Sequence, residues 1–365
     1  MRVRAPRVLV PIAVLGLALG LAACGGDDDD GGGDGGGTIA FLLPESKTAR
    51  YESQDRPLFE AKVESECPDC EIKYSNADQD TSKQQQQVEA AVTEGVDVMV
   101  LDPVDSAAAA GLVTRAKQAD IPVISYDRLI LDADLDYYVS FDSVEVGRQQ
   151  GEALSQKLAD EGSPKGPIVQ INGAPTDNNA KLFKEGSTEI FDQEGVEIAK
   201  SYDTPDWSPD EAQVEMEQAI TAEGKDGFAG VYAANDGTAG GAIAALKSAG
   251  IDPASRPVTG QDAELAAIQR ILAGEQYVTV YKPIKPLAEG AAELAVALAR
   301  GEDPPEGLIS GEEDNGQEQV PTVFLETVPV TKDNIEDTII ADDFWSVDEI
   351  CTKQYAQDCK DAGLQ

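Results

Sequence analysis

Polar and aromatic side chains gather in the segments that follow the predicted strands of this 365-residue chain. The segments supply carboxylates, planar amides, cations and aromatic rings, and they are residues 44–51, 102–105, 127–128, 172–179, 206–207, 235–236, 261–262 and Lys282. A sugar hydroxyl both donates and accepts hydrogen bonds, so carboxylate and amide oxygens suit its proton while cationic groups suit its oxygen. The flat rings of Tyr51 and Trp207 suit the apolar C–H face of a pyranose. These residue types predict a site for a compact polyhydroxylated ligand.

Two other interpretations of the same segments remain open. Asn, Asp and Ser favour helix caps and turns for backbone reasons alone, so each residue taken singly is equally well explained as a cap. Asp127 and Asp262 stand at strand ends, and a pair of carboxylates can cleave a glycosidic bond. The neighbouring amides and cations favour holding a sugar without reaction, but only the separation of the two carboxylates would decide. Polar residues at nearly every strand end favour a shared cleft over isolated caps.

The composition excludes several kinds of chemistry. The chain has no histidine, which removes Ser-His-Asp and Cys-His catalysis and the H-E-x-x-H zinc site. Residues 132–136 begin like a calcium loop, but Tyr137 and Ser143 stand where that loop needs Gly and Glu, and no phosphate-binding glycine motif follows a strand. The formal net charge of −40 repels nucleic acids and anionic lipids. We therefore expect no metal site, no cofactor and no nucleic-acid partner.

Short β-branched runs alternate with amphipathic helical stretches from residue 38 onward. Ten strand candidates form two sets of five, at residues 38–43, 71–75, 96–101, 121–126 and 137–141 and at residues 167–171, 196–202, 228–233, 257–259 and 277–281. Helices are predicted between most of them, at residues 81–94, 106–119, 144–159, 209–222, 237–249 and 286–299. Such alternation requires parallel sheets covered by helices, which predicts an α/β fold with two doubly wound lobes. Ligands of such sheets bind outside the carboxyl ends of the strands.

The first 37 residues are set apart from the globular part. Residues 1–23 carry three arginines and then an apolar run, as is typical of a secretory signal peptide. The run ends in Leu-Ala-Ala-Cys, which resembles the lipobox of bacterial lipoproteins and predicts lipidation of Cys24; a transmembrane anchor or a cleaved signal without lipid is the alternative. After Cys24, residues 25–37 contain only Gly and Asp, which predicts that residues 24–37 form a solvated tether. A calcium-binding tract is the alternative. We expect an extracytoplasmic protein that is lipid-anchored to the cell membrane.

The four remaining cysteines belong to an exported chain, which leaves the reducing cytosol. Cys67 is close enough to pair with Cys70, and Cys351 with Cys359, so two local disulfides are the simplest of the three possible pairings. A redox-active C-x-x-C at Cys67 is the alternative. Such a motif normally starts a helix after a strand, whereas this one follows a predicted helix, so we expect both disulfides to be structural.

Several motifs together resemble those of one known family. They are ARY at residues 49–51, YDRLI at 126–130, YVSFD at 138–142, DNNAKLF at 177–183, NDGTAGGAI at 235–243, TGQDAE at 259–264 and TVYKPI at 279–284. Over residues 38–344 the chain resembles the D-xylose-binding proteins of bacterial ABC importers, which belong to the ribose/galactose-type periplasmic sugar-binding proteins. The resemblance implies a type I periplasmic-binding-protein fold, in which two lobes joined by three hinge strands close around one monosaccharide.

The resemblance also implies roles for individual residues. The implied sugar contacts are Arg50, Tyr51, Asp127, Arg128, Asn179, Trp207, Asn235, Asp262 and Lys282. Tyr51 stands where the family commonly has tryptophan, and Lys47, at a basic position of the family, is a secondary candidate. The implied hinge crossings lie near residues 141–143, 281–283 and 320–323. The N-terminal lobe would then hold residues 38–142 and 283–319, the C-terminal lobe residues 143–282 and 320–345, and a tail residues 346–365.

The function that the resemblance implies is that of a monomeric receptor without enzymatic activity. It would deliver a monosaccharide, with D-xylose favoured, to the membrane permease of an ABC transporter. A sensor subunit that reports sugar occupancy to a membrane kinase or chemoreceptor would use the same cleft. An extracellular glycosidase is the third and least favoured alternative.

Overall fold

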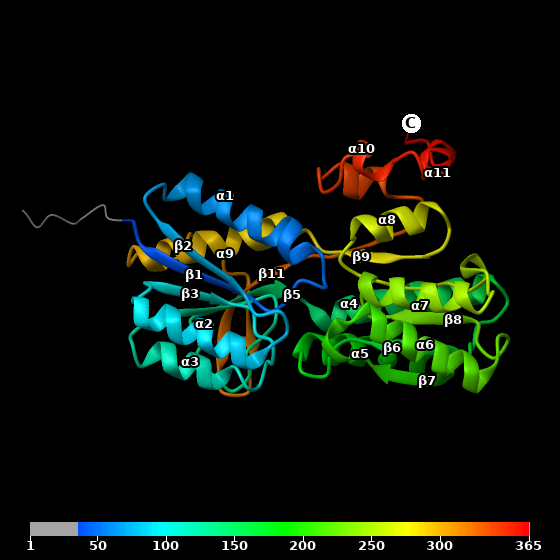
Figure 1. The fold of residues 1–365 in the computed structure, drawn as a ribbon, viewed down its shortest axis with the longest axis horizontal. Helices are drawn as coiled ribbons and strands as arrows, with labels where there is room; N and C mark the ends of the chain where they lie inside the picture. Colours follow the sequence, from blue (N-terminus) through cyan, green and yellow to red (C-terminus); the bar gives the residue numbers. More distant parts are fainter. Residues whose placement is uncertain (1–35, 365) are drawn as a thin grey trace, which may run out of the picture. The chain divides into compact units, whose positions relative to one another are not determined.

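The strands of the first part of the chain lie in one seven-stranded sheet in the computed structural model, which describes residues 36–364. The strand order is β10-β11-β5-β4-β3-β1-β2, and every neighbouring pair is parallel except β10 with β11 (Figure 1). The strands are β1 (Thr38–Leu43), β2 (Glu71–Asn76), β3 (Val98–Leu101), β4 (Val123–Tyr126), β5 (Tyr137–Phe141), β10 (Gly311–Asp314) and β11 (Gln319–Leu325). This sheet and its helices form the N-terminal lobe.

Helices cover both faces of this sheet because its central strands, β1, β3, β4 and β5, are buried on both sides. The helices are α1 (Arg56–Glu66) and α9 (Ile284–Ala299) on one face and α2 (Thr81–Glu94) and α3 (Ala110–Lys117) on the other (Figure 1). Ile39, Phe41 and Leu43 pack into the same core as the buried face of α9. Ala40 and Leu42 pack with residues of α2 and α3. This alternation is the two-residue period of a strand buried on both faces.

The C-terminal lobe is built on a smaller parallel sheet of order β7-β6-β8. Its strands are β6 (Ile168–Asn172), β7 (Ile198–Asp203) and β8 (Gly230–Ala233), and its helices are α4 (Ser143–Asp160), α5 (Asn178–Glu194), α6 (Pro209–Glu223), α7 (Asp236–Ser248) and α8 (Leu265–Leu272). The strand predicted at residues 257–259 is reduced to an isolated bridge from Val258 to Val231. A separate antiparallel pair joins β9 (Thr279–Tyr281) to β12 (Val328–Val330).

The chain crosses between the lobes three times. In the first two the chain runs from β5 into α4 and from β9 into α9. The third crossing was misplaced at residues 320–323: β11 pairs with β5 from Thr322–Tyr138 to Leu325–Phe141, so the chain leaves the N-terminal lobe only after Leu325. The apolar run of residues 320–330 could have added a strand to either sheet. Its first part pairs with the free edge of β5, so the residues up to Leu325 belong to the N-terminal sheet.

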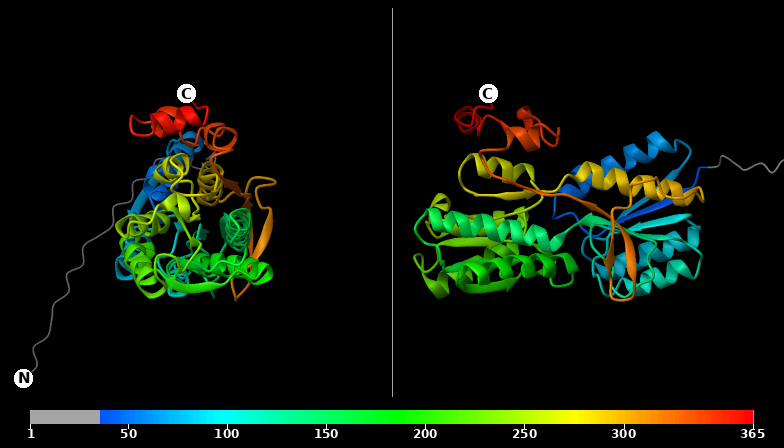
Figure 2. Two further views of the ribbon diagram at one scale, coloured as in Figure 1. Left: turned by 90° about the vertical axis from the view of Figure 1, so that its right-hand side faces the viewer. Right: turned by 180° about the vertical axis from the view of Figure 1, so that it is seen from behind.

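The C-terminal end of the chain forms a small helical layer over α8 (Figures 1 and 2). Its elements are η4 (Glu336–Ile340), α10 (Val347–Ile350) and α11 (Ala356–Asp361); shorter turns elsewhere are η1 (Tyr51–Asp55), η2 (Pro205–Trp207) and η3 (Pro253–Ser255). Both expected disulfides are present, with Cα–Cα distances of 5.2 Å for Cys67–Cys70 and 5.8 Å for Cys351–Cys359. The first lies in the turn between α1 and β2, and the second closes the C-terminal layer.

The predicted signal peptide, Cys24 and nearly all of the tether lie outside the described residues. Every helix within residues 36–364 is too short or too polar to cross a membrane. The predictions of export and lipidation therefore depend on the sequence of the first 24 residues.

Candidate functional site

The nine side chains implied as sugar contacts all line one cavity between the lobes. Each residue is at most 4% exposed. The cavity is small, with about 20 Å³ open to a water-sized molecule, and its wall also contains Thr48, Asp177, Phe183 and Gln261.

The strand ends place these side chains through unusual backbone and capping geometry. Asp127 follows β4 with φ 55°, and Asp262 has φ 93°. These left-handed conformations, uncommon for residues with a side chain, occur at functional sites more often than elsewhere. Asn235 caps α7 by accepting the Thr238 N–H at 2.9 Å, and Asp177 caps α5 in the same way. The cap interpretation is thus correct for Asn235, which lines the cavity as well.

Two cations and three carboxylates form an ion network at one end of the cavity. Arg50 donates to Asp127 and, at 3.1 Å, to Asp55, and its Nε lies 3.5 Å from Asp262 Oδ1. The Lys282 Nζ lies 2.9 Å from Asp262 Oδ1 and 3.9 Å from Asp127 Oδ1. Because Asp262 follows the C-terminal sheet and Arg50 follows β1, the network joins the two lobes.

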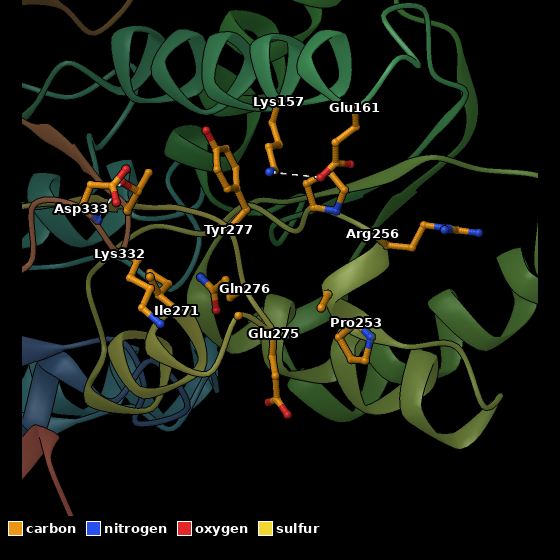
Figure 3. A pocket seen from close by; sticks show the side chains of 14 residues that line it. Lys157, Glu161, Pro253, Arg256, Ile271, Glu275, Gln276, Tyr277, Lys332 and Asp333 are labelled. Carbon is orange, nitrogen blue, oxygen red and sulfur yellow. Dashed lines mark hydrogen bonds and ion pairs between the residues drawn. The ribbon is translucent and has the colours of Figure 1, made fainter. Parts of the chain in front are cut away.

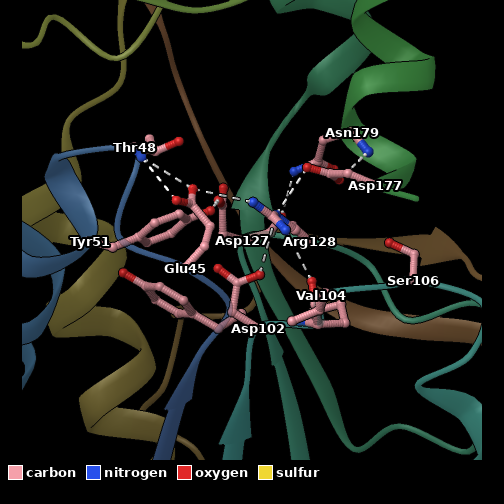
Figure 4. A network of polar contacts seen from close by, with 12 residues as sticks. Glu45, Thr48, Tyr51, Asp102, Val104, Ser106, Asp127, Arg128, Asp177 and Asn179 are labelled. Atoms are coloured by element: carbon pink, nitrogen blue, oxygen red, sulfur yellow. Dashed lines mark hydrogen bonds and ion pairs between the residues drawn. The ribbon is translucent and has the colours of Figure 1, made fainter. Parts of the chain in front are cut away.

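A second network forms around Arg128, as Figure 4 shows. The Arg128 Nε lies 3.0 Å from Asp177 Oδ2 and its NH1 donates to the Pro103 carbonyl at 3.2 Å. A longer contact of 3.7 Å joins Arg128 to Glu45. The indole N–H of Trp207 donates to the same Asp177 oxygen at 3.0 Å. Asp177 of the C-terminal lobe therefore orients both a cation of the N-terminal lobe and an aromatic wall.

Aromatic rings form apolar parts of the wall. The Arg50 guanidinium lies 4.7 Å from the centre of the Tyr51 ring, and Phe183 meets Trp207 edge to face with 6.4 Å between ring centres. Gly173 leaves room for this arrangement, because a Cβ there would lie 2.0 Å from Cη2 of Trp207. Trp207 is therefore held in place by its neighbours and keeps a defined surface toward the cavity.

The carboxylates around the cavity differ in protonation. Burial acts to raise the pKa of Asp127, but the charges of Arg50 and Lys282 outweigh it and hold that pKa below its usual value. Asp127 is thus an anion at neutral pH. Burial raises the pKa of Asp102, which lies behind the cavity, well above its usual value despite the nearby Arg128.

A further acidic cluster lies behind Asp262. The Asp236 carboxylate accepts from Gln276 at 2.7 Å and from the Thr279 hydroxyl and the Glu264 N–H at 2.9 Å each. Glu264 in turn accepts the Ala49 N–H of the other lobe at 3.3 Å. Burial raises the pKa of Asp236 to about 7 and, together with the charge of Asp236, that of Glu264 to about 8. Both carboxyl groups are therefore partly protonated near neutral pH.

Several polar atoms of the cavity wall lack a hydrogen bond to any described residue. They are Arg50 Nε, Asp127 Oδ1, Asn179 Oδ1, Gln261 Oε1 and Asp262 Oδ1, the last of which keeps its ion pair with Lys282. A buried polar atom without a hydrogen bond costs about 1–3 kcal/mol. The set contains one donor and four acceptors and is drawn from both lobes, so a ligand with several hydroxyls could satisfy it.

The sequence analysis did not propose four of the wall residues as contacts. Asp177 and Gln261 lie in the strand-end segments that it singled out, and position alone could have found them. Phe183 lies four residues after Asn179 on α5, which places both side chains on one face of that helix. Thr48 likewise lies in such a strand-end segment, residues 44–51.

The secondary candidate Lys47 does not line the cavity. It is 42% exposed and lies 3.9 Å from the 60% exposed Asp206 of the other lobe. An exposed ion pair of this kind contributes little stability. Lys47 therefore belongs to the outer contact between the lobes.

A second cavity, shown in Figure 3, measures about 230 Å³ and lies in the C-terminal lobe. Its cations and carboxylates are balanced, and Lys157 pairs with Glu161 at 3.1 Å. None of the predicted contact residues lines it. Within residues 36–364, no group of three or more acidic or cysteine side chains is arranged to hold a metal ion.

Comparisons with known proteins agree with this geometry. Residues 39–303 match the family described as periplasmic binding protein domain. A D-xylose-binding periplasmic protein of Escherichia coli K12 is 38% identical over 316 residues, which are 86% of this chain and 92% of the relative. A multiple sugar-binding periplasmic receptor of Rhizobium radiobacter is 30% identical over 330 residues, with the same coverage of 86% and 92%. An ABC transporter solute-binding protein of Clostridium phytofermentans, solved with bound β-D-glucose, has a TM-score of 0.76 at 28% identity and covers 86% of this chain and 99% of its own.

Proposed function

The chain belongs to the periplasmic binding protein domain family, and from this premise we propose that it is the extracytoplasmic substrate-binding component of an ABC importer. It captures one monosaccharide between its lobes and presents the closed form to a membrane permease. D-xylose is the favoured ligand, because the relative of 38% identity is a D-xylose-binding protein. Lipid on Cys24 would keep this monomeric receptor near the permease.

Unpaired polar atoms of both lobes that face one enclosed cavity are the main support for this proposal. In an open form, water would satisfy Asn179, Gln261 and Asp262. A sugar that bonds to both lobes replaces that water only when the lobes are closed, so its differential affinity stabilises the closed form. The nine proposed contacts supply acceptors and donors for ring hydroxyls, and Tyr51 and Trp207 cover the apolar ring face.

The ion network argues against Asp127 and Asp262 as the catalytic pair of a glycosidase. A glycosidase needs one carboxyl group whose raised pKa makes it a proton donor. Asp127 has the opposite shift, and Asp262 is paired with Lys282 at 2.9 Å. The same two cations contact both carboxylates, which suits fixed hydrogen-bond acceptors better than an acid and base acting in turn.

Isothermal titration of the purified protein with D-xylose, D-glucose, D-ribose, L-arabinose and a xylo-oligosaccharide tests the proposal. We expect saturable binding of a monosaccharide, tightest for D-xylose, and no cleavage of the oligosaccharide. Failure of every aldopentose and aldohexose to bind would refute the proposal. A permease and an ATPase encoded beside the gene would favour import over the sensor function, whereas a kinase or chemoreceptor would favour sensing.

A further inference from the structure

Phe344 and Trp345 are consecutive residues of the C-terminal segment, defined as residues 331–364 after β12, and lie behind the ion pair of Asp262 and Lys282. The Trp345 indole N–H donates to the carbonyl of Ala263, one residue after Asp262, at 2.8 Å. The Phe344 ring packs on Tyr281, one residue before Lys282, with 5.0 Å between ring centres. Trp345 thus contacts the residue that follows Asp262, and Phe344 contacts the residue that precedes Lys282. Asp262 and Lys282 both line the cavity.

The backbone that presents Asp262 is strained. Asp262 has φ 93° and Ala263 has φ 52°, and such positive values disfavour residues other than glycine. The Asp262 N–H donates to the Val280 carbonyl at 2.9 Å and the Ala263 N–H to the Thr279 hydroxyl at 3.1 Å. These bonds hold the N–H side of the loop, and the Trp345 indole holds its carbonyl side.

The C-terminal segment is itself attached to both lobes. Gln269 of α8 donates to the carbonyls of Glu349 at 3.2 Å and Ile350 at 3.3 Å. Gln54 of the N-terminal lobe donates to the Phe344 carbonyl at 3.4 Å. Figures 1 and 2 show the segment lying over α8, and its disulfide closes the layer. These contacts fix the position of the segment, so the Trp345 indole can restrain the Asp262–Ala263 loop.

We propose that Trp345 is a positioning residue for the ligand site: its indole N–H holds the Asp262–Ala263 loop in the strained conformation that directs the Asp262 carboxylate into the cavity beside Lys282. This inference rests on the proposed sugar-binding function. It assigns a role in ligand affinity to a residue of the C-terminal segment, which lies outside the cavity wall. Phe344 packs on Tyr281 and so supports the backbone beside Lys282, the partner of Asp262 in the ion pair.

The variant Trp345→Phe keeps an aromatic ring and removes the donor. We expect D-xylose to bind about three- to tenfold more weakly, which corresponds to the loss of one ordinary hydrogen bond. Binding is followed by the fluorescence of Trp207, which is the other tryptophan of the chain and lines the cavity. The matched control is Gln357→Met, which removes a hydrogen bond from Gln357 to Asp361 within α11 of the same segment without touching the Asp262 loop and should leave affinity within twofold.

A double-mutant cycle separates positioning from general destabilisation. In an Asp262→Asn background, Trp345→Phe should weaken binding by less than twofold, because the carboxylate that the indole directs is gone. An equal loss in both backgrounds, or no loss in the wild-type background, overturns the inference. Phe344→Leu gives an independent test that does not depend on the folding of the tryptophan variant, with a weaker affinity expected. Absence of sugar binding by the wild-type protein would instead refute the proposed function.

Discussion

Replacing Asp127 by asparagine keeps the shape of the side chain and removes its charge. In the wild-type protein one oxygen, Oδ2, accepts from Arg50 and from the Tyr51 hydroxyl at 2.7 Å, whereas Oδ1 faces the cavity without a hydrogen bond to any described residue. The lowered pKa means that this free oxygen belongs to an anion at neutral pH. It is therefore a strong acceptor for a sugar hydroxyl.

The expected loss follows from the kind of bond removed. A hydrogen bond to a charged group contributes about 1.5–3 kcal/mol, so Asp127→Asn should weaken D-xylose binding by roughly 10- to 150-fold. The variant should still fold, because Asp55 and Asp262 continue to compensate the charge of Arg50. Alanine at Asp127 should lower affinity further, since it also leaves the Tyr51 hydroxyl without its acceptor.

Isothermal titration of wild-type and variant protein measures this loss, and thermal unfolding of both shows that the variant is folded. Asp160→Asn, an exposed change on α4 with the same effect on net charge, is the control and should bind like the wild type. Binding by a folded Asp127→Asn protein within twofold of the wild-type affinity would refute the assignment of Asp127 as a direct ligand contact.

Three further predictions concern the walls and supports of the site. Gly173→Ala should weaken sugar binding at least tenfold by displacing Trp207, measured by titration, whereas Gly290→Ala, whose new methyl meets only ordinary contacts of 3.6 Å, should not. Glu264 holds its proton in the folded state up to about pH 8 but releases it near its ordinary pKa when unfolded, so its contribution to stability is present at pH 4 and lost as pH rises through 8. Urea unfolding of Glu264→Gln should therefore show a stability that improves relative to the wild type between pH 5 and 8; a constant difference would contradict this. Serine at both cysteines of the C-terminal disulfide should destabilise that segment by about 2–3 kcal/mol, seen as faster hydrogen exchange in α10 and α11.

Much of the fold follows from patterns within short stretches of sequence. The alternation of strands and helices predicted two parallel-sheet lobes, and strand periodicity explains how Phe41 and Leu42 reach opposite cores. The two disulfides join cysteines only three and eight residues apart, so local chain geometry was enough to predict them. The weakest local prediction was residues 257–259, where a short run forms a single bridge and no strand.

The candidate site was partly predictable because parallel strands end at a common edge. The strand ends gave the segments, the family resemblance selected nine contacts within them, and all nine line one cavity. The strand-end rule could not show that Asp177 joins Arg128 to Trp207, because the partners of a carboxylate depend on how the lobes meet. It also could not exclude Lys47, whose side chain points to the outer surface between the lobes.

The amino-acid sequence by itself determined the fold class, the strand-end positions of the polar residues and the local disulfides, since each depends on periodicity or on neighbours along the chain. Only the tertiary structure decided that β11 completes the N-terminal sheet and that Trp345 bonds to Ala263, 82 residues earlier. Such contacts depend on which open edge or face remains after the lobes have formed. The free energy of these contacts depends on residues that are far apart in the sequence, so no short stretch of sequence predicts them.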